Sequence, residues 1–100
     1  MTYIRIGAGR IDYGRKVVSF SFRCPGAQSV TLAGDFDNWD VSAHPMIYDS
    51  PLDIWTVALP LEPGRYEYKF FVDGRVWWND AFAPKVPNVW GSENSYLDVE

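Results

Sequence analysis

Residues 66–74 read YEYKFFVDG, and their side chains alternate between the two faces of an extended chain. Aromatic or β-branched residues at every second position predict a central β-strand with one buried face. Asp73-Gly74 then predicts a tight turn, because glycine adopts positive φ freely and aspartate tolerates it. Lys69 lies on the face opposite to the tyrosines, where it is either an ordinary solvated lysine or a fixed donor on a binding face.

The same two-residue period recurs on both sides of this strand. It is found at residues 16–23, 29–34, 54–59 and 95–99, separated by turn signals such as Cys24-Pro25-Gly26. Trp55 is in phase with Val57 and Leu59, so we expect it in the core. No segment has the period of an amphipathic helix of three turns. About seven short strands predict an all-β fold, a two-sheet antiparallel β-sandwich without a helix longer than about two turns.

The first 15 residues have a weaker pattern than the rest of the chain. We interpret residues 1–15 as a lead-in or an edge strand, and residues 16–100 as the sandwich. Gly7 and Gly9 could suggest a dinucleotide-binding loop, but Asp12 stands where the third glycine is needed and no helix follows.

Composition excludes several classes of function. One hundred residues are enough for one domain with its own core. A formal net charge of -4 argues against binding to nucleic acid or to an anionic membrane, and no apolar run approaches a membrane span of ~20 residues. A single cysteine and the absence of a recognisable signal peptide favour the cytoplasm.

Metal sites are poorly supported. Asp35, Asp37 and Asn38 resemble the start of a calcium loop, but the sixth position is not glycine and Met46 occupies the place of the bidentate glutamate. His44 and Cys24 are single and lie in separate segments, so they indicate neither a zinc site nor a catalytic triad.

Enzymatic activity is equally poorly supported. Asp73, Asp80 and Glu93 could be nominated as paired carboxylates for glycoside hydrolysis, but each adjoins a turn. A sandwich of this size also offers no deep cleft. We therefore expect no catalysis and no cofactor.

The unusual feature of the composition is its five tryptophans, more than a core of this size needs. Three of them lie in or beside loops: Trp39, Trp90, and either Trp77 or Trp78. Neighbouring residues of a strand face opposite ways, so only one of Trp77 and Trp78 can be buried in the sandwich. An indole packs well on the C–H face of a pyranose, while groups such as Lys69 and Asn94 can bond its hydroxyls. These two residues and the loop tryptophans are therefore our candidates for a carbohydrate-binding site. Exposed tryptophans also concentrate at protein interfaces, so spacing alone leaves both functions open.

An ordered series of motifs separates these possibilities. It consists of GDFDNW at residues 34–39, LEPGRYEYKFFVDG at 61–74, Asp80, and GSEN at 91–94. Over about residues 16–99 the series resembles a family-48 carbohydrate-binding module, as in the glycogen-binding domain of AMP-activated protein kinase β subunits and the modules preceding the barrels of branching and debranching enzymes. The resemblance implies an immunoglobulin-like, early-set sandwich that binds α-1,4-glucan without catalysis.

The resemblance also implies roles for five residues. Trp39 would stack on glucose, Lys69 would bond sugar hydroxyls, and Trp77 would be the second stacking residue. Asn94 would bond hydroxyls, and Trp90 would reach over the sugar chain from the position just before Gly91, where an aliphatic residue is expected. We expect Trp39, Trp77 and Trp90 to be largely accessible and to lie on one side of the sandwich.

The chain departs from the family pattern in three places. Asp37 and Ser95 stand where asparagines are usual, and the segment after Gly74 is one residue longer, which leaves the choice between Trp77 and Trp78 open. Two alternative functions remain: a protein-interaction module with a kinase-like or other partner, or the binding module of a family-13 glycoside hydrolase supplied on another chain.

Overall fold

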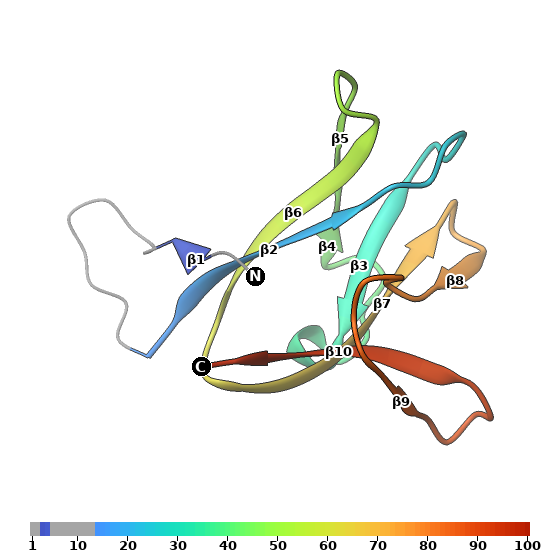
Figure 1. The fold of residues 1–100 in the computed structure, drawn as a ribbon. Coiled ribbons are helices and arrows are strands. Elements are labelled where there is room, and N and C mark those ends of the chain that lie inside the picture. The colour runs from blue at the N-terminus through green and yellow to red at the C-terminus, as the bar shows by residue number, and fades with distance from the viewer. Residues whose placement is uncertain (1–2, 5–13) are drawn as a thin grey trace.

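A computed structural model describes residues 3–4 and 14–100 of the chain. In these residues, ten β-strands form two antiparallel sheets that enclose a common core (Figure 1). The predicted all-β sandwich is therefore confirmed. The interpretation of Gly7 and Gly9 concerns residues outside the described part.

The first sheet has four strands in the order β1-β2-β6-β5. They are β1 (Tyr3–Ile4), β2 (Lys16–Phe22), β6 (Ile54–Leu61) and β5 (Ile47–Asp49). Strand β2 pairs with β6 along its whole length, from Lys16 opposite Leu61 to Phe22 opposite Trp55. Residues 3–4 pair with Val17 and Val18 of β2.

The second sheet has six strands, five of them in the order β4-β3-β7-β10-β9. They are β4 (His44–Pro45), β3 (Val30–Gly34), β7 (Gly64–Val72), β10 (Glu93–Val99) and β9 (Lys85–Pro87). The sixth, β8 (Val76–Trp78), pairs with residues 70–72 of β7, beyond the residues 64–68 that pair with β10.

Strand β7 is the central strand that its alternation predicts. Phe70 lies opposite Leu32 of β3 and both are fully buried, whereas Lys69 points to the other face and is half-buried. The turn after β7 is also confirmed, because Asp73 and Gly74 both have positive φ, 53° and 65°. The Asp73 carboxylate accepts hydrogen bonds from the backbone N–H groups of residues 28 and 29, which ties this turn to the start of β3.

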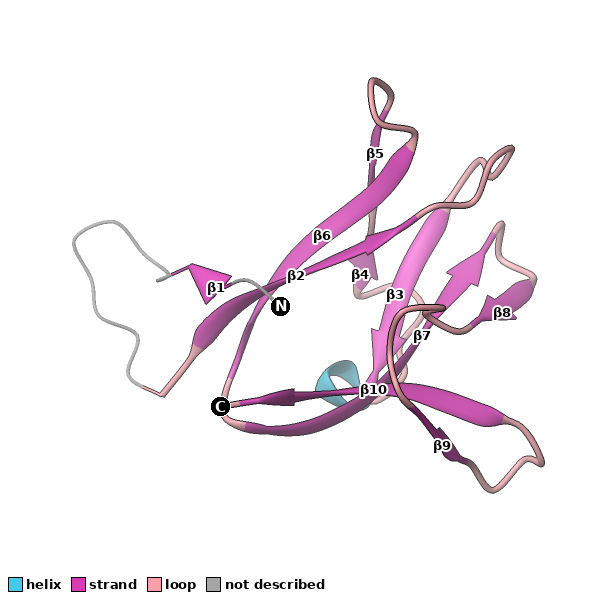
Figure 2. Cartoon of the chain, viewed as in Figure 1, coloured by secondary structure: helices cyan, strands magenta, loops and turns pink. Residues whose placement is uncertain are grey.

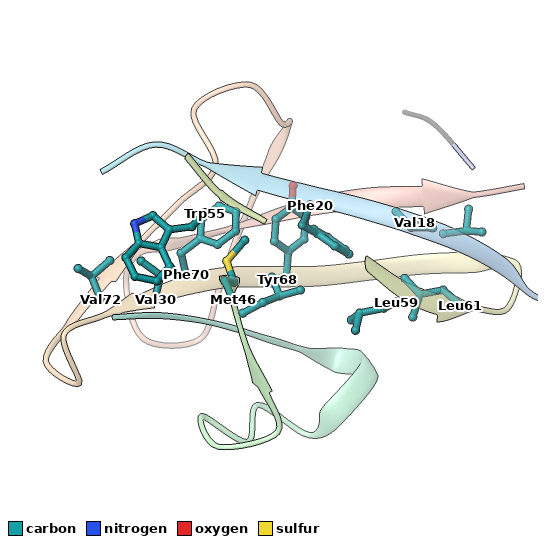
Figure 3. Packing of buried hydrophobic residues seen from close by; sticks show 12 residues of the cluster. Val18, Phe20, Val30, Met46, Trp55, Leu59, Leu61, Tyr68, Phe70 and Val72 are labelled. Atoms are coloured by element: carbon teal, nitrogen blue, oxygen red, sulfur yellow. The ribbon is translucent and has the colours of Figure 1, made fainter. Parts of the chain in front are cut away.

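Twelve buried apolar side chains fill the space between the sheets (Figure 3). Trp55 is among them, as predicted, with 9% of its surface exposed and its ring 5.1 Å from that of Tyr48. Tyr68 is buried as well, and its hydroxyl donates to Asp80 Oδ2 at 2.7 Å. Burial, and then this hydrogen bond, raise the pKa of Tyr68, so it stays a neutral donor.

Three short strands, namely β4, β5 and β9, lie in segments for which the sequence predicts no strand. Each has only two or three residues and is defined by pairing with a neighbour, which no internal period can reveal. Figure 2 shows the one helical element of the described residues, a single 3₁₀ turn, η1 (Asp35–Asp37), at the end of β3. No helix in the described part of the chain is long and apolar enough to cross a membrane.

Gly34 occupies a place with no room for a side chain. A Cβ there would overlap the carbonyl oxygen of Glu67 and lie 2.9 Å from both the Phe36 ring and Tyr68 Cβ. We expect Gly34→Ala to lower the free energy of unfolding by roughly 2–3 kcal/mol, since a backbone oxygen cannot move aside as a flexible side chain can. Urea denaturation of the two proteins measures this difference, and an unchanged midpoint would contradict it.

Candidate functional site

A groove of about 1030 Å³ lies on the outer face of the six-stranded sheet, where β7 and β10 present their outward side chains. The loop after β3, strand β8 and the β9–β10 connection complete it. Its lining contains all five predicted site residues: Trp39, Lys69, Trp77, Trp90 and Asn94. Trp78 is not among the described residues that line it.

Two indoles form an aromatic pair in this groove. The ring centroids of Trp39 and Trp77 lie 6.1 Å apart at 65°, an edge-to-face arrangement. The Trp77 ring is also 4.5 Å from that of Phe71, the residue opposite it on β7. Trp77 therefore has a fixed orientation while 41% of its surface remains exposed.

Trp39 is held by the loop that follows β3. Asn38 and Trp39 both have left-handed backbone conformations, with φ of 54° and 60°, which non-glycine residues adopt only at a cost of roughly 1–3 kcal/mol each. The Trp39 backbone N–H donates to the Gly34 carbonyl at 2.9 Å. The indole N–H donates to Asp35 Oδ1 at 3.2 Å, and Asp35 Oδ2 accepts from the backbone N–H of Glu67 at 2.8 Å. Asp35 thus connects the Trp39 ring to the central strand.

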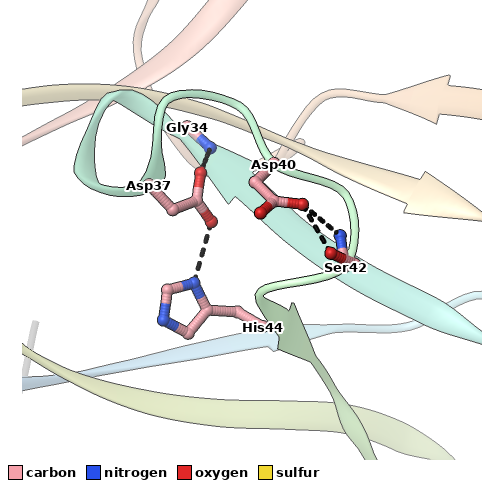
Figure 4. A network of polar contacts seen from close by, with 5 residues as sticks. All are labelled: Gly34, Asp37, Asp40, Ser42 and His44. Carbon is pink, nitrogen blue, oxygen red and sulfur yellow. Dashed lines mark hydrogen bonds and ion pairs between the residues drawn. The ribbon is translucent and has the colours of Figure 1, made fainter.

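Asp37 braces the same loop from its other side (Figure 4). Its Oδ1 accepts from the Gly34 backbone N–H at 3.1 Å, and its Oδ2 lies 2.8 Å from His44 Nδ1 on β4. An ionised carboxylate only accepts hydrogen bonds, so His44 Nδ1 carries the proton in this contact.

Asp40 forms a separate contact further along the same loop. Hydrogen bonds from the hydroxyl and then the backbone N–H of Ser42 lower the pKa of Asp40.

Polar side chains of β7 and β10 supply hydrogen-bonding groups to the groove. Asn94 Nδ2 donates to Glu67 Oε1 at 3.0 Å, and Lys69 Nζ lies 3.4 Å from Ser92 Oγ. Lys69 and Asn94 are half-buried, so part of each remains open to a ligand. The described residues contain no group of three or more histidine, cysteine, aspartate or glutamate side chains placed to hold a metal ion.

The tip of the β9–β10 hairpin, residues 88–92, contributes the third tryptophan. Trp90 is 86% exposed and the neighbouring Val89 is 90% exposed. Both side chains line the same groove as Trp39 and Trp77, and exposed apolar side chains gathered in one place are typical of binding surfaces.

The structure corrects one expectation about the tryptophans. Trp39 was expected to be largely accessible, but it is half-buried, because it packs on Trp77 and bonds to Asp35. At most one of Trp77 and Trp78 could be buried in the sandwich, and neither is, since 41% and 52% of their surfaces are exposed. Strand β8 pairs only with the end of β7, at the edge of the sandwich, where too few residues lie above it to bury an indole.

Sequence reasoning missed four polar residues of the groove: Asp35, Glu67, Asn88 and Ser92. Asp35 and Glu67 fall inside the quoted motifs and could have been found there. The role of Asn88 depends on the closure of a hairpin that no sequence period predicts.

The described residues thus form a β-sandwich with an exposed groove that is lined by aromatic and polar side chains. The family model described as the glycogen recognition site of AMP-activated protein kinase matches residues 17–100, and the chain belongs to this family.

Similar sequences occur within much longer proteins. The chain is 44% identical over 73 residues to the chloroplastic protein FLOURY ENDOSPERM 6 of Oryza sativa subsp. japonica, which it covers to 13%. It is 36% identical over 72 residues to the 1,4-alpha-glucan branching enzyme GlgB 1 of Rhizobium johnstonii, covering 10%. It is 30% identical over 74 residues to the branching enzyme GlgB of Marinobacter nauticus, covering 12%. The matches cover 71–73% of this chain, so the likeness concerns the module alone.

Proposed function

We propose that the groove binds α-1,4-glucan, as glycogen, starch or maltooligosaccharide, and performs no chemistry on it. The observation that carries this proposal is the gathering of Trp39, Trp77 and Trp90 in one groove with Lys69 and Asn94. Indole faces suit the C–H faces of glucose units, and the amine and amide suit their hydroxyls.

The charges of the groove favour a neutral ligand. Asp35 and Glu67 line it together with a single lysine, so a phosphorylated or anionic polymer would meet two carboxylates. Neutral hydroxyls, in contrast, can donate to those carboxylates. An open, solvated groove of this kind supports a dissociation constant between about 1 μM and 1 mM. A sugar hydroxyl that exchanges its hydrogen bonds to water for hydrogen bonds to protein gains little net free energy.

Electrophoresis in native gels tests the proposal. Glycogen cast into the gel should retard the protein relative to a gel without polysaccharide, and hydroxyethyl cellulose, whose glucose units are β-1,4-linked, should not. Equal migration with and without glycogen would contradict the proposal. Retardation by both polymers would contradict its specificity for α-glucan.

Replacing Lys69 tests the hydrogen-bonding part of the site. We expect Lys69→Ala to weaken glucan binding by roughly three- to tenfold, since one hydrogen bond in a solvated groove contributes about 0.7–1.4 kcal/mol net. The loss should be nearly the same at low and high salt, because the ligand carries no charge to be screened. Calorimetric titrations at two salt concentrations measure both effects. A loss that disappears at high salt would contradict the assignment of Lys69 to a hydrogen bond with an uncharged hydroxyl.

We further propose that the module delivers α-glucan to an enzyme, on the same or a separate chain. The names of the branching-enzyme relatives support this role, and a kinase-like partner is a second possibility that the family description supports. A pure protein-interaction module is the alternative, and the exposed Trp90 and Val89 favour it as much as they favour a sugar. The cytoplasmic location stays a prediction.

A further inference from the structure

One side chain organises the tip of the β9–β10 hairpin. Asn88 Oδ1 accepts from the backbone N–H groups of Trp90 and Ser92, at 2.9 and 3.1 Å. Asn88 Nδ2 donates to Ser92 Oγ at 2.8 Å and to Asn94 Oδ1 at 3.0 Å. The backbone adds a bond from Asn88 N–H to the Ser92 carbonyl at 3.0 Å. Both the acceptor and the donor of this amide are therefore used in closing the tip.

Asn88 also determines which way the Asn94 amide faces. Asn94 Oδ1 accepts from Asn88 while Asn94 Nδ2 donates to Glu67 Oε1 at 3.0 Å, so the reversed orientation would place donor against donor and acceptor against acceptor. One N–H and one lone pair of Asn94 remain for a ligand. A sugar hydroxyl therefore meets an amide whose orientation is already set.

Trp90 depends on this tip for its position. Its side chain is 86% exposed, so packing does little to restrain it. A tip that had to become ordered upon binding would lose affinity, because immobilising its side chains costs conformational entropy. An ordered tip presents the indole in advance.

We propose that Asn88 is a positioning residue of the glucan site, which acts through Trp90 and Asn94 rather than by contact with the sugar. The inference rests on the proposed function of the groove and adds a residue outside the motifs that indicated it. Asn88 differs from Asp35, which holds Trp39, in that it orders the backbone around its tryptophan.

Two substitutions separate the two halves of this role. Asn88→Asp keeps the acceptor for the Trp90 and Ser92 amides and loses both donated bonds, whereas Asn88→Ala loses all four. We expect hydrogen exchange, followed by NMR, to accelerate at the Trp90 and Ser92 amides in Asn88→Ala and to stay close to wild type in Asn88→Asp. Unchanged exchange in Asn88→Ala would overturn the inference.

Binding to a maltooligosaccharide is the second readout. We expect Asn88→Ala to weaken it on the order of tenfold, and Asn88→Asp by less, since the tip stays ordered while Asn94 loses its orientation. In a Trp90→Ala background the Asn88→Ala effect should shrink, because a positioning residue loses importance when its tryptophan is gone. Gln28→Ala removes an exposed side chain in the connection between β2 and β3 and serves as the matched control, with wild-type exchange and affinity.

The outcomes distinguish this inference from the proposed function. A wild-type protein that binds glucan no better than Asn88→Ala, or an effect that stays the same in the Trp90→Ala background, would overturn the inference alone. A wild-type protein that binds no α-glucan would overturn both.

Discussion

Replacing Trp39 and Trp77 together by alanine is expected to remove measurable α-glucan binding. Each indole that loses about 60 Å² of apolar contact with a sugar forfeits on the order of 1.5 kcal/mol, which is about tenfold in affinity. Two such losses give about 100-fold if they are independent, and the double loss is smaller than the sum of the single-variant losses if the rings act as a unit. The ring centroids lie only 6.1 Å apart, so coupling between the two substitutions is expected. Calorimetric titration with a maltooligosaccharide measures the loss.

Trp78→Ala is the matched control for this double variant. Trp78 is the neighbour of Trp77 on the same strand and is exposed to 52%, but it is not one of the described residues that line the groove. Its replacement should leave affinity unchanged. Equal heats from the double variant and the wild type, or an equal loss in Trp78→Ala, would contradict the assignment of the aromatic pair.

Replacing Trp55 by alanine is expected to have the largest effect on stability. Its ring belongs to the buried cluster and lies 5.1 Å from that of Tyr48. Emptying so large an aromatic site typically destabilises a protein by about 3–5 kcal/mol, which is a large part of the stability of a domain of this size. Urea denaturation followed by circular dichroism measures the change in the free energy of unfolding.

The control for the stability measurement again uses the exposed tryptophans. Trp90→Ala, at a position 86% exposed, should change the free energy of unfolding by no more than about 0.5 kcal/mol. A similar loss in Trp55→Ala and Trp90→Ala would contradict the division of the tryptophans into core and groove. A stable Trp55→Ala protein would contradict the core assignment directly.

The longer strands could be predicted because their buried and outward-facing residues alternate. In β7, buried Tyr68, Phe70 and Val72 alternate with outward residues, and the period alone places Lys69 on the outer face. The strands β4, β5 and β9 could not be predicted, because two or three residues carry no period. Their positions come from pairing with longer strands, β4 with β3, β5 with β6 and β9 with β10.

The composition of the groove could be predicted in part. The motifs indicated its five proposed ligand-binding residues, and the structure brings all of them into one groove. How they are held could not be predicted, since it depends on long-range hydrogen bonds. The Asp35 carboxylate reaches the backbone of Glu67, 32 positions away, and Asn94 reaches the Glu67 side chain. Such contacts need the register of neighbouring strands, which the local sequence does not contain.

The central claim, that α-glucan binds in this groove, is tested most directly by the indole N–H signals in a ¹H–¹⁵N spectrum. The chain has five tryptophans, so five signals are expected, which single Trp→Phe variants would assign. During titration with a maltooligosaccharide, the signals of Trp39, Trp77 and Trp90 should move, and those of Trp55 and Trp78 should stay in place. Five unmoved signals at millimolar sugar, or movement confined to Trp55 or Trp78, would contradict the claim.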